Sequence, residues 1–264
     1  MDDKQFISPL AVVDPRAKLG KNVVVEPFAV IEGNTVIGDG THVHNGAVIK
    51  SGARIGKECR IHSYAILSDV PQDLKFRGEE TTLEVGDRTT IREFATIHRG
   101  TASKGVTRIG SDCLIMAYVH VAHDCTLGNH IILGNTTQLA GEVQVDDYAN
   151  VSGGVLVHQF VRLSRYIMVQ GGSRINKDIP PYSLVGRDPI IFCGINYVGL
   201  RRNGFTDEQI FIINEIYRLL YQSGLNTSEA LRKIESIYPA STERDQILSF
   251  VRSSERGVVR GGME

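Results

Sequence analysis

Aliphatic residues recur at every sixth position through the first two thirds of the chain. Counted in sixes from Ile7 to Ile175, 26 of the 29 positions are aliphatic, and the exceptions are Asp73, Glu79 and Ser103. A period of six fits neither an α-helix nor an alternating strand. It is typical of a parallel β-helix, in which every six residues form one short strand and one corner. The pattern therefore predicts a solenoid.

Three such hexads form one triangular coil of 18 residues, so positions 18 apart stack in columns that rise roughly 4.8 Å per coil. The aliphatic side chains are expected to point inward, beside the small or β-branched residues found four positions further on. Glycine often follows the aliphatic position, as at Gly38 and Gly110. We expect these glycines to supply positive φ at tight corners. Because each coil bonds only to its neighbours, the ends need caps.

Two polar, turn-rich segments interrupt the period, at residues 69–82 and 100–108. They are predicted to be loops inserted at corners of the prism, a place where solenoids accept insertions and often carry function. The period stops at Pro180–Pro181. Residues 1–181 are therefore predicted to form the β-helix with its two loops, and residues 182–264 a connector and a small C-terminal helical domain.

The C-terminal part changes to a helical period. Thr206 and Gln209 form a capping-box signal ahead of apolar residues at helical spacing, and Gly224 is expected to end that helix. Two further helices are predicted at 227–237 and 242–256, before Pro239 and Gly257. Together these helices are expected to cap the last coil.

Composition narrows the class of partner. The net charge of −1 argues against broad nucleic-acid binding, but residues 160–204 hold seven basic residues against two acidic ones. This local excess suits an acidic partner or a phosphate as well as an ordinary solvated face.

No secretory segment or apolar run of about 20 residues is present, which predicts a cytoplasmic protein without membrane insertion. Interior slots hold Cys59, Cys113 and Cys125, expected to be packed, reduced thiols.

Histidines are the best candidates for chemistry. His98, His120, His123 and His158 gather near the loops and later coils, whereas the other four are expected to be solvated surface groups: His42, His44, His62 and His130. One column runs from His123 through Gly141 to Gln159. A base beside an unobstructed backbone N–H is the minimum equipment for acyl transfer.

Two features leave alternatives open. His120, His123 and His98 could bind zinc, although His-x-x-His spacing suits a helix better than this segment. Glycines stack in two further columns, Gly153 with Gly171 and Gly154 with Gly172. Without side chains, these glycines would leave a groove on the surface. Alternatively, glycine is present there only because it fits the corners of the coils.

Seven segments together resemble one known family, the acyl-[acyl-carrier-protein]–UDP-N-acetylglucosamine O-acyltransferases, which start lipid A synthesis. They are QDLKFRGE (72–79), VGDR with TIHRGT (85–101), AHDCTLGN (122–129), LAG (139–141), VHQF (157–160), DIPPYSL (178–184) and GLRRNGF (199–205). The resemblance covers nearly the whole chain. It implies a left-handed parallel β-helix, a left hand that sequence periodicity alone would not predict. It also implies a homotrimer with sites between subunits.

The resemblance further implies transfer of an (R)-3-hydroxyacyl chain from acyl carrier protein to the 3-hydroxyl of UDP-N-acetylglucosamine, without metal or cofactor. His123 matches the family's general base, Asp124 the residue that holds its imidazole, and Gly141 the oxyanion donor. The matching substrate-binding positions are Asp73, Lys75, His98, His120, His158, Gln159, Gly171, Asn196 and Arg202. Glycine at 171 hints at a longer acyl chain, and the basic 160–204 segment would face the acidic carrier.

Three positions depart from the family's pattern. Glu142 stands where the family has histidine, Val198 where it has an acid, and Asn203 where it has a second arginine. The last two put details of nucleotide binding in doubt. Rival interpretations are the related N-acyltransferase, whose extra N-terminal domain is missing here, a trimeric zinc carbonic anhydrase on the same β-helix, and a non-enzymatic scaffold.

Overall fold

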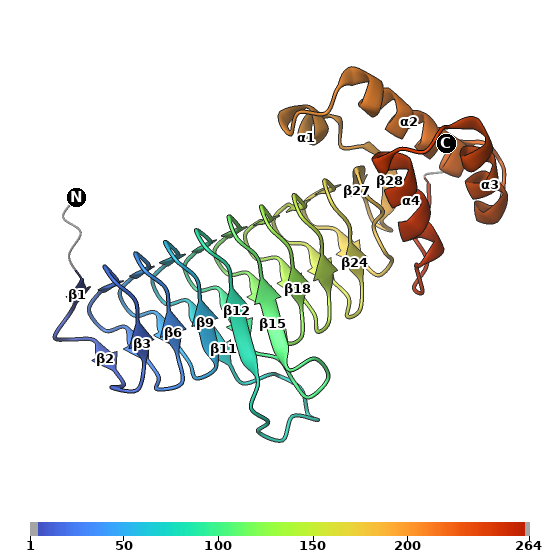
Figure 1. The fold of residues 1–264 in the computed structure, drawn as a ribbon. Helices are drawn as coiled ribbons and strands as arrows, with labels where there is room; N and C mark the ends of the chain where they lie inside the picture. The colour runs from blue at the N-terminus through green and yellow to red at the C-terminus, as the bar shows by residue number, and fades with distance from the viewer. Residues whose placement is uncertain (1–4, 262–264) are drawn as a thin grey trace.

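The computed structural model describes residues 5–261, which form a triangular prism of stacked coils followed by a cluster of helices. Figure 1 shows the coils running from β1 at one end to the helices at the other, with two loops projecting together from one corner midway along the prism. Each coil contributes one short strand to each of three sheets, which are parallel except where β28 (Ile191–Ile195) pairs antiparallel with β27 (Ser183–Gly186). These sheets are the three faces of the prism.

The first face has eleven strands: β1 Phe6–Ile7, β4 Val24–Val25, β7 His42–Val43, β10 Arg60–Ile61, β13 Thr90–Ile91, β16 Leu114–Ile115, β19 Ile132–Leu133, β22 Asn150–Val151, β25 Met168–Val169, β27 Ser183–Gly186 and β28 Ile191–Ile195. The second has nine: β2 Val12–Val13, β5 Val30–Ile31, β8 Val48–Ile49, β11 Ile66–Asp69, β14 Thr96–His98, β17 His120–Val121, β20 Gln138–Leu139, β23 Leu156–Val157 and β26 Arg174–Ile175. The third has eight: β3 Lys18–Leu19, β6 Val36–Ile37, β9 Ala53–Ile55, β12 Thr82–Val85, β15 Val106–Ile109, β18 Thr126–Leu127, β21 Gln144–Val145 and β24 Arg162–Leu163.

The column rule predicted from the sequence is confirmed. His120 pairs with Gln138, and Gln138 with Leu156, each one coil further along. The two insertions lengthen their coils without breaking the ladder, since Ile66 still pairs with Thr96 and Thr96 with His120. The hexad aliphatics fill the prism as one continuous buried cluster. Cys59, Cys113 and Cys125 lie buried in it as free thiols, and burial raises the pKa of Cys125 to about 12.

The expectation for the glycines after the aliphatic slot is wrong. Positive φ occurs two residues later in the hexad, at positions that hold large residues such as Tyr118 (φ 61°) and Tyr148 (φ 60°). The corner glycines are required by contact between coils instead. A Cβ on Gly38 would lie 2.6 Å from the Gly56 carbonyl carbon, and one on Gly110 2.4 Å from the Gly128 oxygen. Stacked corners at this spacing leave no room for a side chain.

Four helices follow the prism: α1 Tyr197–Arg202, α2 Asp207–Gln222, α3 Thr227–Ile237 and α4 Thr242–Arg252. The capping box at Thr206 and Gln209 is confirmed, α2 ends just before Gly224, and α3 has the predicted bounds. Their apolar faces form a second buried cluster. None of the helices within residues 5–261 combines the length and the apolar character that a membrane crossing requires.

The last predicted helix is shorter than expected, because the chain after Arg252 bonds to the end of the prism. Ser254 donates to the buried Asp178 carboxylate at 2.8 Å, and the Val259 N–H donates to the Asp178 carbonyl at 2.9 Å. The predicted connector is also more ordered than its sequence suggested, since β27 and β28 extend the first face beyond residue 181. The helical segment is thereby anchored on the final coils.

Candidate functional site

A cavity of about 590 Å³ opens along the second face, over the coils that carry β17, β20, β23 and β26. Five of the predicted site residues line it: His120, His123, Gly141, His158 and Gln159. The other lining residues are Gln72, Ala122, Gln138, Leu139, Ala140, Leu156, Val157, Arg174, Ile175 and Asn176. Histidines lie beside an apolar floor of solenoid residues in this cavity. Such a surface suits a substrate with a polar and an aliphatic part.

His123 stands at the corner that follows β17. Its Nδ1 lies 2.8 Å from Oδ2 of Asp124, and its ring extends over Gly141 in the next coil. A Cβ on Gly141 would lie only 2.7 Å from Cε1 and Nε2 of that ring. Glycine at 141 therefore creates the space that the imidazole occupies, as the column through both residues predicted.

Asp124 is completely buried, yet it is held as a carboxylate. Burial opposes its ionisation, but hydrogen bonds from Thr101 and His123 bring the pKa of Asp124 below its usual value. The Thr101 hydroxyl donates to Oδ2 at 2.6 Å, and the Thr101 N–H to Oδ1 at 3.0 Å. An ionised carboxylate only accepts hydrogen bonds, so His123 donates from Nδ1 and keeps Nε2 as the free lone pair.

Loop 100–108 is thus part of the site, although no pattern in the sequence indicated how. Its Thr101 and the backbone N–H of Lys104, 3.2 Å from Asp124 Oδ1, supply the donors that keep Asp124 charged. The Asp124 N–H in turn donates to the hydroxyl oxygen of Thr107, in β15, at 2.8 Å. These partners were missed because nothing in a linear pattern relates an insertion to the coil that follows it.

His98 and His120 form a second pair beside His123. His120 Nδ1 lies 2.7 Å from the Thr96 hydroxyl, and the two imidazoles meet edge to face at 4.8 Å. Burial, with the neighbouring His98 and His123, lowers the pKa of His120 to about 4. Burial likewise lowers the pKa of His98, whose Nδ1 has no hydrogen-bond partner among residues 5–261. Both rings are neutral at pH 7.

The backbone N–H of Gly141 is a further feature of this corner. At the same hexad slot in some other coils, a carboxylate accepts this hydrogen bond: Glu26 from Asn45 at 3.0 Å, and Glu32 from Ser51 at 2.8 Å. No acceptor in the described part of the chain takes the Gly141 N–H. The donor therefore remains available to a bound molecule beside His123.

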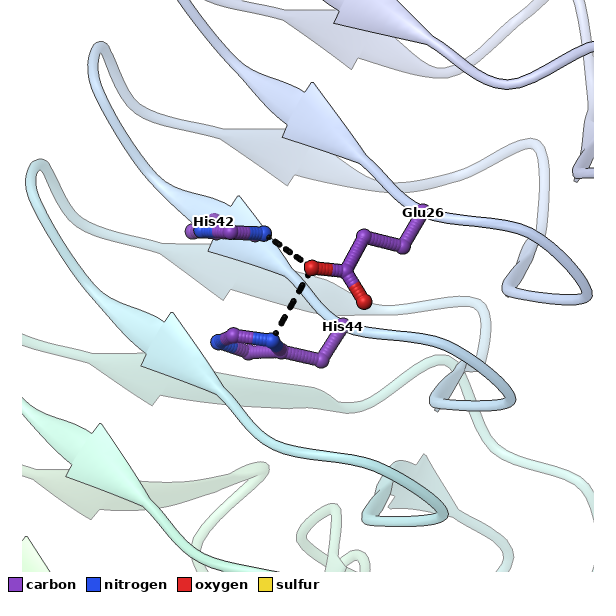
Figure 2. A group of neighbouring side chains, drawn as sticks. All are labelled: Glu26, His42 and His44. Carbon is purple, nitrogen blue, oxygen red and sulfur yellow. Dashed lines mark hydrogen bonds and ion pairs between the residues drawn. The ribbon is translucent and has the colours of Figure 1, made fainter. Parts of the chain in front are cut away.

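Zinc at His98, His120 and His123, the sequence-level alternative, finds no geometric support, because their nitrogens do not converge. Among residues 5–261, the one group with ligand atoms close enough for a metal ion is Glu26, His42 and His44 (Figure 2). Glu26 Oε1 lies 2.7 Å from His42 Nε2 and 3.2 Å from His44 Nδ1. The two rings are stacked, with centroids 4.0 Å apart and planes 14° apart, and each presents a nitrogen to Oε1 of Glu26.

These histidines differ from the prediction of isolated surface groups. His62 continues the stack on His44 at 4.6 Å, so a glutamate-bridged ladder runs along three coils of the first face. The fourth histidine, His130, stacks on Tyr148 at 4.6 Å and belongs to a second cavity.

That second cavity, of about 510 Å³, lies between the first face and α1 and is lined by Asn196 and Arg202 together with Tyr148, Val198 and Asn203. Asn196 caps α1 by accepting from the Gly199 N–H at 3.1 Å. Neither Asn196 nor Arg202 lines the His123 cavity. A single chain therefore separates the predicted site residues into two groups on different faces.

Five predicted residues line neither cavity: His98 and Asp124, described above, and Asp73, Lys75 and Gly171. Asp73 and Lys75 lie on loop 69–82, of which only Gln72 reaches the His123 cavity. Gly171 is exposed and follows Gly153 in its column, where a Cβ on Gly171 would lie 3.2 Å from the Gly153 carbonyl oxygen. With Gly154 and Gly172 beside them, these glycines leave a strip of bare backbone on the surface.

Stacked hexad coils and a histidine cavity place the chain among the hexapeptide-repeat transferases. The family described as bacterial transferase hexapeptide (six repeats) matches residues 34–69 and 107–141, and that described as UDP-N-acetylglucosamine O-acyltransferase, domain 2, matches 178–259. The chain belongs to the acyl-[acyl-carrier-protein]–UDP-N-acetylglucosamine O-acyltransferase family. The resemblance inferred from its motifs, and the left-handed β-helix that it implied, are confirmed.

Relatives match along almost the full length. The acyltransferase of this family from Sulfurihydrogenibium is 52% identical over 96% of this chain and 93% of its own. That from Halorhodospira halophila is 44% identical over 96% of this chain and 99% of its own. The crystal structure of LpxA, a UDP-N-acetylglucosamine acyltransferase from Bacteroides fragilis, superposes with a TM-score of 0.96 at 52% identity, covering 97% of this chain and 100% of that one.

Proposed function

We propose that this protein transfers an (R)-3-hydroxyacyl chain from acyl carrier protein to the 3-hydroxyl of UDP-N-acetylglucosamine. The names of its relatives, which specify an acyl carrier protein and UDP-N-acetylglucosamine, support this donor and this acceptor. The observation that carries the chemistry is the arrangement of His123, whose Nδ1 is held by the buried Asp124 while its ring lies against Gly141. A base and a free backbone donor then face the same point of one cavity.

In this proposal, Nε2 of His123 removes the proton of the sugar 3-hydroxyl as that oxygen attacks the thioester carbonyl. Negative charge develops on the carbonyl oxygen, where the Gly141 N–H donates a hydrogen bond. The ionised Asp124 stabilises the imidazolium that forms. Collapse of the tetrahedral intermediate breaks the C–S bond, and the imidazolium returns its proton to the departing thiolate. Atoms and charges balance without a metal or cofactor.

The remaining residues are assigned by substrate part. His120, neutral at pH 7, lines the polar side of the cavity with His158 and Gln159, and the neutral His98 packs edge to face against its ring. Asp73 and Lys75 would hold the sugar nucleotide, Asn196 and Arg202 its nucleotide portion, and Gly171 the end of the acyl chain. The forked guanidinium of Arg202 suits a diphosphate.

A site shared between subunits would account for the separation of the two cavities. If the His123 group and the Asn196–Arg202 group act on one substrate, they must come from two copies of the chain. A closed homotrimer, as the resemblance implied, would give three equivalent sites of this kind. The same assembly would bring loop 69–82 of one subunit against its neighbour.

The reaction is tested by incubating the enzyme with UDP-N-acetylglucosamine and a ladder of 3-hydroxyacyl carrier proteins, with His123→Ala alongside. We expect transfer that is lost in the variant, and the ladder gives the preferred chain length. Absence of transfer from every donor would overturn the proposed reaction. Transfer retained by His123→Ala would overturn the assignment of the base alone.

Shared sites are tested with hybrids of two inactive variants, His123→Ala and Arg202→Ala, co-expressed with different tags and purified through both. If each site takes His123 from one subunit and Arg202 from the next, every hybrid trimer purified through both tags would hold one intact site out of three. Hybrids no more active than their parents would place both residues in one chain's site.

A further inference from the structure

We propose that Glu142 is a positioning residue for the catalytic pair: through Lys104 and Ser103 it holds loop 100–108 on Asp124, and through Asp124 it orients His123. The catalytic part of this inference rests on the proposed function. Glu142 stands where the family's pattern has a histidine. Its role is inferred from a series of contacts that links its side chain to Asp124 and, through Asp124, to His123.

The column geometry sets up these contacts. Asp124 and Glu142 lie one coil apart in the same column, and both have positive φ, 60° and 61°. The Glu142 N–H donates to the carbonyl oxygen of His123 at 3.0 Å. Two carboxylates are thereby stacked at adjacent corners, immediately beside the imidazole, and a nearby cation reduces their mutual repulsion.

Lys104 is that cation. Its Nζ lies 3.7 Å from Glu142 Oε2 and donates to the main-chain oxygen of Asp124 at 3.2 Å. Its backbone N–H donates to Asp124 Oδ1 at 3.2 Å. The side chain and the backbone of Lys104 therefore hold the same residue, and Glu142 keeps the lysine in place from one coil further along.

Ser103 provides a second link. Its hydroxyl donates to Glu142 Oε1 at 3.1 Å, and its backbone N–H donates to the Thr101 hydroxyl at 3.2 Å, the group that in turn donates to Asp124 Oδ2. Both oxygens of Glu142 thus bind the loop, one by charge and one by a hydrogen bond. Within the described residues, no backbone hydrogen bond joins loop 100–108 to the coil that contains Glu142.

Substituting Glu142→Gln tests the inference with little change in shape, because glutamine can still accept from Ser103 but carries no charge for Lys104. We expect kcat to fall about three- to tenfold, the range for one partly buried ion pair that positions a catalytic group, while KM for both substrates stays within about twofold. Glu58→Gln is the matched control, since Glu58 has φ 54° in the same hexad slot, remote from the cavity.

A readout that needs no substrate accompanies the kinetics. Hydrogen exchange of the peptide covering residues 100–108 should be faster in Glu142→Gln than in wild type or Glu58→Gln, because the Thr101 and Lys104 amides are held less firmly against Oδ1 of Asp124, their common acceptor. In an Asp124→Asn background the kinetic effect of Glu142→Gln should nearly vanish, since both act through one residue.

Unchanged exchange in residues 100–108 would overturn the inference, and so would an undiminished kcat or a full additive loss in the Asp124→Asn background. An enzyme that transfers no acyl group from any donor would overturn the proposed function instead. In that case the exchange measurement still decides whether Glu142 holds the loop on Asp124.

Discussion

The imidazole of His123 occupies the space that a side chain at Gly141 would need. Cε1 and Nε2 of the ring lie 2.7 Å from the position of a Cβ on Gly141, one coil away in the same column. The two residues are 18 positions apart, one full coil of the solenoid. A glycine is thus required because of a neighbouring base, even though its φ is not positive.

Gly141→Ala should therefore impair activity more than stability. Alanine is compatible with the backbone, but its Cβ pushes the imidazole away from the Gly141 N–H, and we expect kcat to fall about 10- to 100-fold. The melting temperature should change by only about 3 °C. Gly33→Ala is the control, at the same hexad slot, where the Cβ meets only the exposed side chain of Arg16. Full activity in Gly141→Ala would show that the ring has other room to occupy.

His123→Ala should lower kcat by roughly 10²- to 10⁴-fold, the usual contribution of a general base. The fold should remain, because His123 lies at a corner and contributes nothing to the buried aliphatic cluster. Steady-state kinetics and circular dichroism check the two statements. His62→Ala, which removes a histidine of the first face outside both cavities, should keep wild-type kinetics. Comparable losses in both variants would point to disturbed folding.

Gly171→Met should shift the preference toward shorter acyl chains. The glycine strip at 153, 154, 171 and 172 leaves backbone bare, and a methionine side chain there would cover the path of a long chain. The ratio of kcat/KM values across the donor ladder measures the shift, with about 1–3 kcal/mol expected to separate chains that fit from those that do not. An unchanged profile would place the chain end elsewhere.

Acid should destabilise the protein through His120. Its pKa is about 4 in the folded protein against an ordinary value of 6.5, so between these values the unfolded chain binds more protons. Stability is thus lost as pH falls from 6.5 toward 4, by about 2 kcal/mol from this group. Denaturant titrations at pH 7 and pH 5 measure the free energy of unfolding, and its change between the two pH values should be smaller for His120→Gln than for wild type. The control His130→Gln, at an exposed histidine, should show the same change as wild type.

Much of the fold could be predicted because a solenoid makes three-dimensional neighbours a fixed distance apart in sequence. The hexad register, the pairing of His123 with Gly141, the capping box at Thr206 and the bounds of α3 all follow from local periodicity or local chemistry. The corner glycines were assigned the wrong cause, because positive φ falls on residues such as Tyr118 that no propensity rule selects.

The amino-acid sequence by itself determined the β-helix, its insertions and the column that holds a base next to a free backbone donor, since each depends on spacing within one or two coils. Only the tertiary structure decided that loop 100–108 keeps the buried Asp124 ionised, and that Asn196 and Arg202 lie on a different face from His123. Those relationships join segments whose separation follows no period. They arise from how an inserted loop folds back and how the three faces of a prism point in different directions.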